Sequence, residues 1–118
     1  MSSIDVTENV HDPLTLLCAA SDVPPSGGKR VELESRPPIA VFRIGNEFFA
    51  IDDLCTHAGA SLSEGEVIDG QLFCPAHSGK FDLRSGKALE FPATEDLRTY
   101  AVVLSGGSVF VSLRGQSQ

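Results

Sequence analysis

The sequence has no hydrophobic run that could cross a membrane, because no stretch approaches the ~20 consecutive apolar residues that a helical span needs. Its first residues, MSSIDVTENVHDP, also lack the apolar core of a secretion signal, and no twin arginines are present. From these absences we expect a cytoplasmic protein that does not associate with membranes.

Basic side chains are scarce in this chain. Nine Lys and Arg residues stand against sixteen Asp and Glu residues, which gives a formal net charge of −7. This excess of negative charge repels the phosphates of nucleic acids, so DNA and RNA are poor candidate partners. The same charge would steer the protein toward a partner with a basic surface.

Cysteine is also rare, and its three copies do not form the pattern of a disulfide framework. Cys18, Cys55 and Cys74 are odd in number and widely spaced. In a reducing compartment, cysteines that lie near histidines in the sequence more often indicate a metal site.

Good helix formers seldom occur in runs, and eleven Gly and seven Pro residues interrupt the chain. Short β-branched or aromatic segments lie between these breaks, and several are joined by hairpin signals at Gly45-Asn46, Asp69-Gly70 and Gly106-Gly107. A chain of 118 residues has the size of one domain. We therefore predict a single all-β domain over residues 1–118, an antiparallel β-sandwich with a loose N-terminal arm at about 1–12. The expected strands are 14–19, 30–33, 39–44, 47–51, 71–74, 97–104 and 108–113.

Two matched Cys–His pairs carry the chemistry. Cys55 and His57 form the first pair, and Cys74 and His77 form the second after sixteen intervening residues. Each pair offers one thiolate and one imidazole, a combination suited to an iron–sulfur cluster or to zinc. A strand pair closed by the Asp69-Gly70 turn would bring the two pairs together.

The motif C-x-H-x16-C-x2-H resembles that of the Rieske [2Fe–2S] proteins. The residues SGKFD after the second pair and Phe91-Pro92, which is similar to the proline-bearing loop over the cluster in that family, extend the resemblance. It covers residues 14–113 and is most similar to the small Rieske-type ferredoxins. The flanking segments that agree are SDVPPSGGKRVEL, AVFRIGNEFFAIDDLCTHAGASLSEGEV and VVLSGGSVFVSL.

The resemblance implies a Rieske iron–sulfur fold, with a small cluster-binding portion at about 53–93 and one [2Fe–2S] cluster per chain. It implies that Cys55 and Cys74 hold one iron while His57 and His77 hold the other. Two thiolates and two neutral imidazoles leave the oxidised cluster with no net charge. Reduction is therefore easier than in a ferredoxin with four cysteine ligands.

Departures from the family pattern predict a low reduction potential within the Rieske range. High-potential members have a disulfide at the positions of Ala60 and Ala76, and hydroxyl side chains at the positions of Gly79 and Phe81. Without those hydroxyl groups, fewer hydrogen bonds stabilise the reduced cluster. We expect a potential toward the roughly −150 mV end of the range.

The function implied by the resemblance is electron transfer, without catalytic residues. A soluble, monomeric ferredoxin would take single electrons from a flavin-dependent reductase and pass them to a terminal oxygenase, such as an aromatic-ring-hydroxylating dioxygenase. The oxygenase itself needs a further mononuclear iron site with two histidines, and no histidine follows His77. Two alternatives stay open: the small subunit of an assimilatory nitrite reductase, and a structural zinc module that mediates protein interactions.

Several other residues have simpler interpretations. Cys18 lies in the apolar run LTLLCAA and is expected to be a buried small hydrophobe. The acidic pairs Asp52-Asp53 and Glu64/Glu66 are expected to form a solvated rim. Phe81 and Pro92 are expected to shield the cluster from water.

Overall fold

The structure of this chain is a computed structural model that describes residues 14–34, 36–54, 60–75, 79–90 and 95–113. The expected all-β class is confirmed, since the described helical segments are two three-residue 3-10 turns, η2 (Ala20–Asp22) and η3 (Leu62–Glu64). No described helix is long and apolar enough to span a bilayer. The strands are β1 (Leu14–Ala19), β2 (Gly28–Leu33), β3 (Arg36–Ile44), β4 (Glu47–Asp52), β5 (Glu66–Ile68), β6 (Gln71–Phe73), β7 (Lys80–Asp82), β8 (Ala88–Glu90), β9 (Thr99–Ser105) and β10 (Ser108–Ser112).

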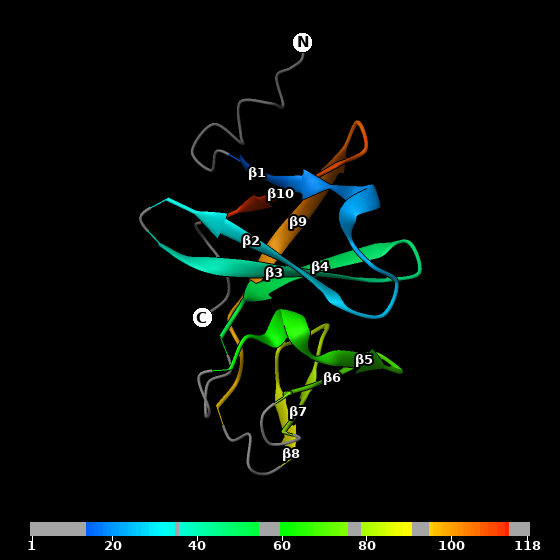
Figure 1. Ribbon diagram of the computed structural model, residues 1–118, viewed down its shortest axis with the longest axis vertical. Helices are drawn as coiled ribbons and strands as arrows, with labels where there is room; N and C mark the ends of the chain where they lie inside the picture. Colours follow the sequence, from blue (N-terminus) through cyan, green and yellow to red (C-terminus); the bar gives the residue numbers. More distant parts are fainter. Residues whose placement is uncertain (1–13, 35, 55–59, 76–78, 91–94, 114–118) are drawn as a thin grey trace.

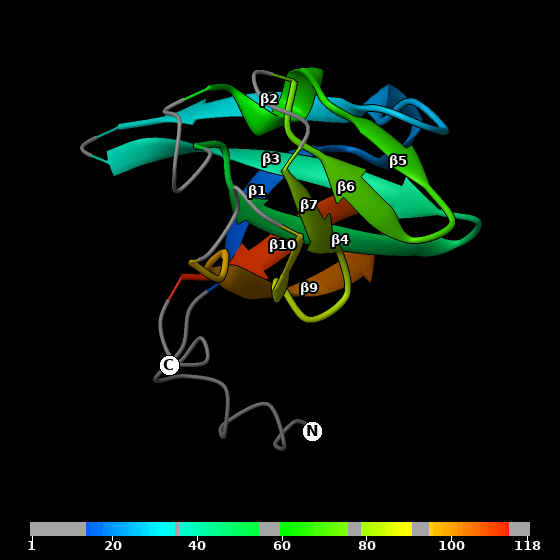
Figure 2. The ribbon, with the colours of Figure 1, turned by 90° about the horizontal axis from the view of Figure 1, so that it is seen from below.

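These strands form two antiparallel sheets (Figure 1). The large sheet has six strands in the order β1-β10-β9-β4-β3-β2, and the small sheet has four in the order β5-β6-β7-β8. The small sheet is one continuous segment of chain, inserted between β4 and β9 (Figure 2). All strand pairings within both sheets are antiparallel, as the hairpin signals predict.

Alternate residues of β3 serve two different cores. Ile39 and Val41 belong to a cluster enclosed by the large sheet, while Ala40 and Phe42 belong to a second cluster that includes residues of the small sheet. Side chains of a strand point alternately to opposite faces, so one strand can serve both. Leu17 of β1 and Val31 of β2 share the first cluster although they lie on opposite edges of the sheet. The large sheet is therefore curled on itself, which agrees with the expected sandwich.

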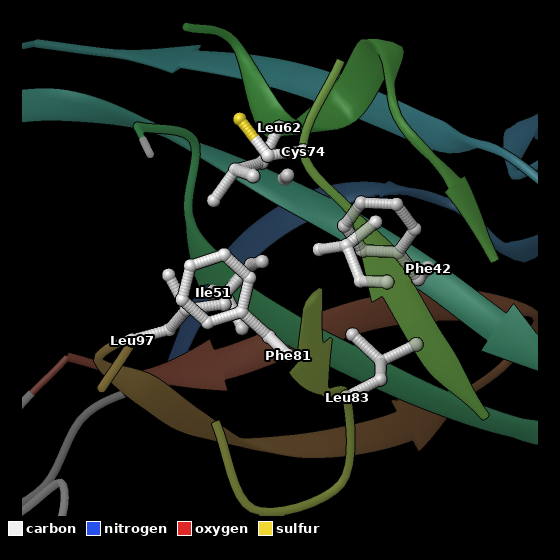
Figure 3. Packing of buried hydrophobic residues seen from close by; sticks show 9 residues of the cluster. Phe42, Ile51, Leu62, Cys74, Phe81, Leu83 and Leu97 are labelled. Carbon is white, nitrogen blue, oxygen red and sulfur yellow. The ribbon is translucent and has the colours of Figure 1, made fainter. Parts of the chain in front are cut away.

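The second cluster joins the two sheets (Figure 3). Phe42 and Ile51 come from the large sheet, and Leu72 and Phe81 come from the small sheet; all four are fully buried. This shared apolar cluster fixes the small sheet to the large one. Its buried members are Ala40, Phe42, Ile51, Leu62, Leu72, Cys74, Phe81, Leu83 and Leu97.

The main error of the sequence prediction lies between residues 52 and 93. The strand 71–74 and its partner before the Asp69-Gly70 turn are expected there and are present as β6 and β5, but the expected strands include neither β7 nor β8. Each of these strands has three residues, which is too short for an alternating hydrophobic pattern to appear in the sequence. Their stability comes from packing on the large sheet rather than from local propensity.

The expected hairpin turns are present. Asp69 and Gly70 both have positive φ, at 52° and 77°, as a two-residue turn between β5 and β6 requires. Gly106 and Gly107 have φ values of 59° and 81° between β9 and β10. Since these conformations are costly for most residues, the turns fix the register of the strands on either side.

Gly65 lies at a close backbone approach just before β5. A Cβ atom there would collide with the carbonyl oxygen of Phe73 and lie 3.2 Å from that of Leu62. We expect Gly65→Ala to lower the free energy of unfolding by about 1–3 kcal/mol, because backbone must move to admit the methyl group. Chemical denaturation monitored by circular dichroism measures this change.

Gly27→Ala is the matched control for Gly65→Ala. Its Cβ would make only an ordinary contact, 3.6 Å from Pro24 Cγ. We expect its free energy of unfolding to be unchanged or raised by up to about 1 kcal/mol, since alanine restricts the unfolded chain. Equal destabilisation in both variants would contradict the steric explanation.

Candidate metal centre

Of the four predicted ligands, the structure describes Cys74. Cys55, His57 and His77 lie outside the described residues. In the described part of the chain there is no group of three or more His, Cys, Asp or Glu side chains placed to hold a metal. The geometry of the centre is therefore built from the residues on either side of each Cys–His pair.

The second pair begins at Cys74, immediately after β6. The backbone N–H of Cys74 donates to the carbonyl oxygen of Gly79 at 2.8 Å, just before β7 begins. Phe73 and Lys80 are paired on the two strands next to this bond. Residues 75–78, which include His77, thus connect two hydrogen-bonded strands.

The first pair lies between Asp53, which follows β4, and Ser61, which precedes η3. The Ser61 hydroxyl donates to Asp53 Oδ2 at 2.6 Å, and the backbone N–H of Ser63 donates to Asp53 Oδ1 at 2.5 Å. These bonds hold together two points that are about ten residues apart in the chain. The Asp53 side chain therefore joins the two ends of the segment that contains Cys55 and His57.

The β5–β6 hairpin brings the two segments close to each other. Glu66 is paired with Phe73, so the residues just before β5 and just after β6 lie side by side. Leu62 and Cys74 consequently belong to the same buried cluster, and Figure 3 shows them next to each other. The prediction that the Asp69-Gly70 turn brings the two regions together is confirmed for the described residues on either side of the pairs.

The Cys74 thiol fits the chemistry of a soft metal ligand. Its residue is only 2% exposed, it is not in a disulfide, and no hydrogen bond from the described residues reaches its sulfur. The sulfur points away from Phe42, toward the edge of the cluster (Figure 3). A buried sulfur that is not in a disulfide is well placed to bind iron or zinc, both of which take thiolate ligands.

Cys18 lies in a different part of the fold. It packs at the border of the cluster inside the large sheet, while Cys74 belongs to the cluster between the sheets. Burial, with a smaller effect from the Asp22 carboxylate, raises the pKa of the Cys18 thiol. Cys18 is half-buried rather than buried as expected, while its packing against this cluster, apart from Cys74, agrees with a structural role.

The expected solvated acidic rim is wrong for Asp53 and right for Glu64 and Glu66. Asp53 is 3% exposed, the sole buried charged residue in the described part of the chain, whereas the two glutamates are exposed. The burial of Asp53 could not be predicted from the sequence, because an acidic residue next to another acidic residue, Asp52, is normally expected to be exposed. Its place two residues before Cys55 is the signal that could have marked it.

Asp52 points to a separate group of polar side chains. Its Oδ1 accepts hydrogen bonds from Tyr100 Oη at 2.6 Å and from Arg36 Nη2 at 2.8 Å. Partial burial and the bond to Asp52 raise the pKa of the Tyr100 hydroxyl. These contacts connect β3, β4 and β9 and account for Asp52 without a catalytic role.

The positions that set the expected potential are both buried. Phe81 is fully buried in the same cluster as Cys74, and Gly79 accepts the bond from the Cys74 backbone. Neither side chain carries a hydroxyl group. The predicted shielding role of Phe81 agrees with this packing, while Pro92 lies outside the described residues.

Comparison with protein families decides the assignment. Residues 14–101 match the Rieske [2Fe-2S] domain. The chain belongs to this family. Its cofactor is accordingly a [2Fe–2S] cluster, and the two-sheet architecture is the Rieske fold.

Relatives of this Rieske chain include electron carriers. It is 44% identical to the 3-phenylpropionate/cinnamic acid dioxygenase ferredoxin subunit of Escherichia coli strain K12, over 81% of this chain and 90% of that protein. The Sphingomonas yanoikuyae B1 ferredoxin has a similar structure, with TM-score 0.81 and 33% identity over 85% of this chain and 98% of that one. A complex of reduced oxygenase and oxidised ferredoxin in carbazole 1,9a-dioxygenase contains a chain with TM-score 0.78 and 38% identity, over 84% of this chain and 92% of that one.

The Rieske chain also resembles a small subunit from another enzyme class. A nitrite reductase NADPH small subunit has TM-score 0.72 and 28% identity, over 84% of this chain and 97% of that one. This likeness is weaker in both sequence and structure than the likeness to the Sphingomonas yanoikuyae ferredoxin.

Proposed function

We propose that this protein is the ferredoxin of a ring-hydroxylating dioxygenase system. In this role it takes single electrons from a flavin-dependent reductase and gives them to a terminal oxygenase. The observation that carries the proposal is the 44% identity to a dioxygenase ferredoxin subunit, of which the chain covers 90%. The carbazole dioxygenase complex, in which a ferredoxin is bound to an oxygenase, supports the choice of acceptor.

The proposed ligands are Cys55 and Cys74 for one iron, and His57 and His77 for the other. The burial of the Cys74 sulfur and the closeness of the residues flanking the two pairs support this assignment. When bound, the cluster supplies one-electron chemistry, in which no bond to a substrate is made or broken.

The protein's own residues control the environment of this chemistry. Phe81, Leu62 and Leu97 pack in the cluster that contains Cys74 and keep water from its sulfur. A lower local dielectric constant strengthens the effect of nearby dipoles and charges on the potential. Partner proteins bind at the surface of the carrier. Its net charge of −7 favours a partner whose docking surface is basic.

The proposal also includes the cellular location, the oligomeric state and the domain organisation that the sequence predicts. The proposed carrier is located in the cytoplasm. It works as a monomer, since relay proteins use small, transient interfaces. One domain spans residues 1–118, and its cluster-binding portion covers about 53–93. The four short strands in that portion support this division.

The test of function uses the purified, cluster-loaded protein. Anaerobic reduction by dithionite should give a rhombic [2Fe–2S] EPR signal with the low average g value of histidine ligation, and the sample should contain iron and sulfide. The reduced protein should then reoxidise when mixed with a terminal oxygenase. An EPR-silent sample with zinc and no sulfide would instead identify a structural zinc module.

The nitrite reductase likeness gives a second candidate function, that of a permanent small subunit. Affinity purification from the native organism separates the two. A freely diffusing carrier should elute alone, whereas a stoichiometric large subunit that remains bound through purification would favour the second function.

We predict a reduction potential toward the roughly −150 mV end of the Rieske range. Gly79 and Phe81 provide no hydroxyl groups to stabilise the more negative reduced state. Protein-film voltammetry measures the potential directly, and a value well above about 0 mV contradicts the prediction.

The variant Phe81→Tyr tests the cause of the low potential. It adds one hydroxyl group to a ring that packs with Cys74, so we expect it to raise the potential. Phe48→Tyr adds the same group beside the other cluster, inside the large sheet, and should leave the potential unchanged.

A further inference from the structure

Asp53 is a buried carboxylate whose two oxygens are both occupied. Its side chain has no exposed surface. Oδ1 accepts the backbone N–H of Ser63 at 2.5 Å. Oδ2 accepts the hydroxyl groups of Ser61 at 2.6 Å and Ser63 at 3.1 Å, and Arg30 Nη1 at 3.1 Å. A buried charge is tolerated only with such a set of donors and a counter-charge, so this arrangement is specific to an acidic residue.

The two ligand segments are closed in different ways. The second is closed by the backbone, through the bond from Cys74 to Gly79. Across the first, no backbone hydrogen bond joins residues 53–54 to 60–63 in the part of the chain that the structure describes, and the backbone N–H of Asp53 donates instead to Pro38 at 3.0 Å. Among the described residues, the hydrogen bonds that Ser61 and Ser63 make across the first segment go to the Asp53 side chain.

Arg30 extends this closure to the large sheet. Arg30 lies on β2, and its Nη1 donates to both Asp53 Oδ2 and Ser61 Oγ, the latter at 3.3 Å. The same guanidinium donates through its Nε to Glu32 Oε2 at 2.8 Å. One cation thus ties β2 to both ends of the segment that contains Cys55 and His57.

We propose that Asp53, held by Arg30, is the positioning residue of the first ligand segment: its buried carboxylate fixes the segment's two ends and so places Cys55 and His57 for the cluster. This inference rests on the proposed ligand assignment. Asp53 contributes no ligand atom in it, and it acts through Ser61 and Ser63.

The variant Asp53→Asn tests the carboxylate with little change in size. An amide has only one acceptor oxygen. Its NH₂ group must face a fixed N–H donor, either the Ser63 backbone at the Oδ1 position or Arg30 at the Oδ2 position. The matched control is Asp52→Asn, because Asp52 also accepts bonds from an arginine and a hydroxyl group but does not contact Ser61 or Ser63.

Three quantities are measured on the cluster-loaded variants: the half-life of the cluster in excess chelator, the EPR g values after dithionite reduction, and the midpoint of urea unfolding. We expect Asp53→Asn to shorten the half-life about tenfold or more and to shift the g values, in line with other residues that orient metal ligands. Asp52→Asn should keep the wild-type g values and stay within about twofold in half-life, even where its unfolding midpoint falls.

Arg30 supplies a rescue test. Arg30→Met leaves the buried carboxylate without its counter-charge and should shorten the half-life, whereas Arg30→Lys should restore most of it. Should Asp53→Asn fail to fold, Ser61→Ala replaces it, since it removes the 2.6 Å bond and leaves the carboxylate in place.

The outcomes separate this inference from the proposed function. Wild-type g values together with a half-life equal to that of Asp52→Asn overturn the positioning role, as does a wild-type half-life in Ser61→Ala. If the variants overturn the positioning role but the wild-type protein holds a [2Fe–2S] cluster, the electron-carrier proposal stands. A wild-type protein that holds no [2Fe–2S] cluster overturns the ligand assignment and this inference with it.

Discussion

Cys74→Ser is expected to abolish the [2Fe–2S] cluster. Serine offers a hard, protonated oxygen in place of a soft thiolate, and iron–sulfur clusters are held by thiolates. The site is also unfavourable for the new hydroxyl group, because Cys74 is 2% exposed and packs among apolar side chains. The visible absorption of the purified protein, its iron and sulfide content, and its EPR signal should all be lost. His77→Ser is expected to lose or strongly perturb the same signals.

Cys18→Ser is the control for this substitution. It makes the same chemical change at a cysteine in β1, which packs against the cluster inside the large sheet. The cluster should assemble normally, with iron, sulfide and EPR spectrum equal to those of the wild type. The ligand assignment fails if Cys74→Ser or His77→Ser also retains the wild-type spectrum.

Phe81→Ala is expected to lower the free energy of unfolding by about 3–5 kcal/mol, a large share of the stability of a small domain. The ring is fully buried where the small sheet meets the large one, and its loss leaves a cavity in the cluster that joins the two sheets, beside Ile51 and Leu97 (Figure 3). Because the same cluster encloses Cys74, we expect faster release of iron as well. Urea denaturation and iron release into a chelator measure the two effects.

Ile68→Ala controls for the loss of an apolar side chain from the small sheet. Ile68 lies on β5 and is 48% exposed. Its truncation leaves no closed cavity, so the expected cost is below about 1 kcal/mol. A comparable loss of stability in the two variants would show that Phe81 does not connect the sheets in the way described.

The strands of the large sheet could be predicted because they are long enough to show a pattern. The segment 14–19 is β1 to the residue, and β3 and β4 are found with small errors at their ends. β3 begins earlier than expected, at Arg36, and includes Pro37 and Pro38, residues that usually argue against a strand. Neither proline has a partner in the register with β2, because both lie where that register shifts between Ile39 and Arg36. Proline is tolerated at such an irregularity, where no ladder hydrogen bond is needed from its nitrogen.

The small sheet could not be predicted in the same way. Strands of three residues carry too few side chains to display alternation, and β7 and β8 contain the polar sequence KFD and the mixed sequence ALE. Their pairing is visible only when Leu72 and Phe81 are seen buried in the cluster that joins the two sheets.

The burial of individual aromatic rings could not be predicted for a related reason. Phe48 and Phe49 are partly buried at the margins of the two clusters, and their rings are covered by Arg43 and Arg84 at 5.4 and 5.2 Å. Among the described residues, the fully buried phenylalanine rings are those of Phe42 and Phe81. A count of apolar residues does not distinguish a ring covered by a guanidinium from one enclosed by the core.

The sequence by itself determined the all-β class, the hairpin turns and the family, because a rare set of cysteines and histidines at fixed spacing and glycines at obligatory turns are local features. Only the tertiary structure decided the role of Asp53. Whether a carboxylate is solvated or buried depends on what lies around it, and here those neighbours, Arg30 and Ser61, are 23 and 8 residues away in the chain. Burial is a property of the assembled fold, so a buried charge beside a ligand segment is found only once the sheets are in place.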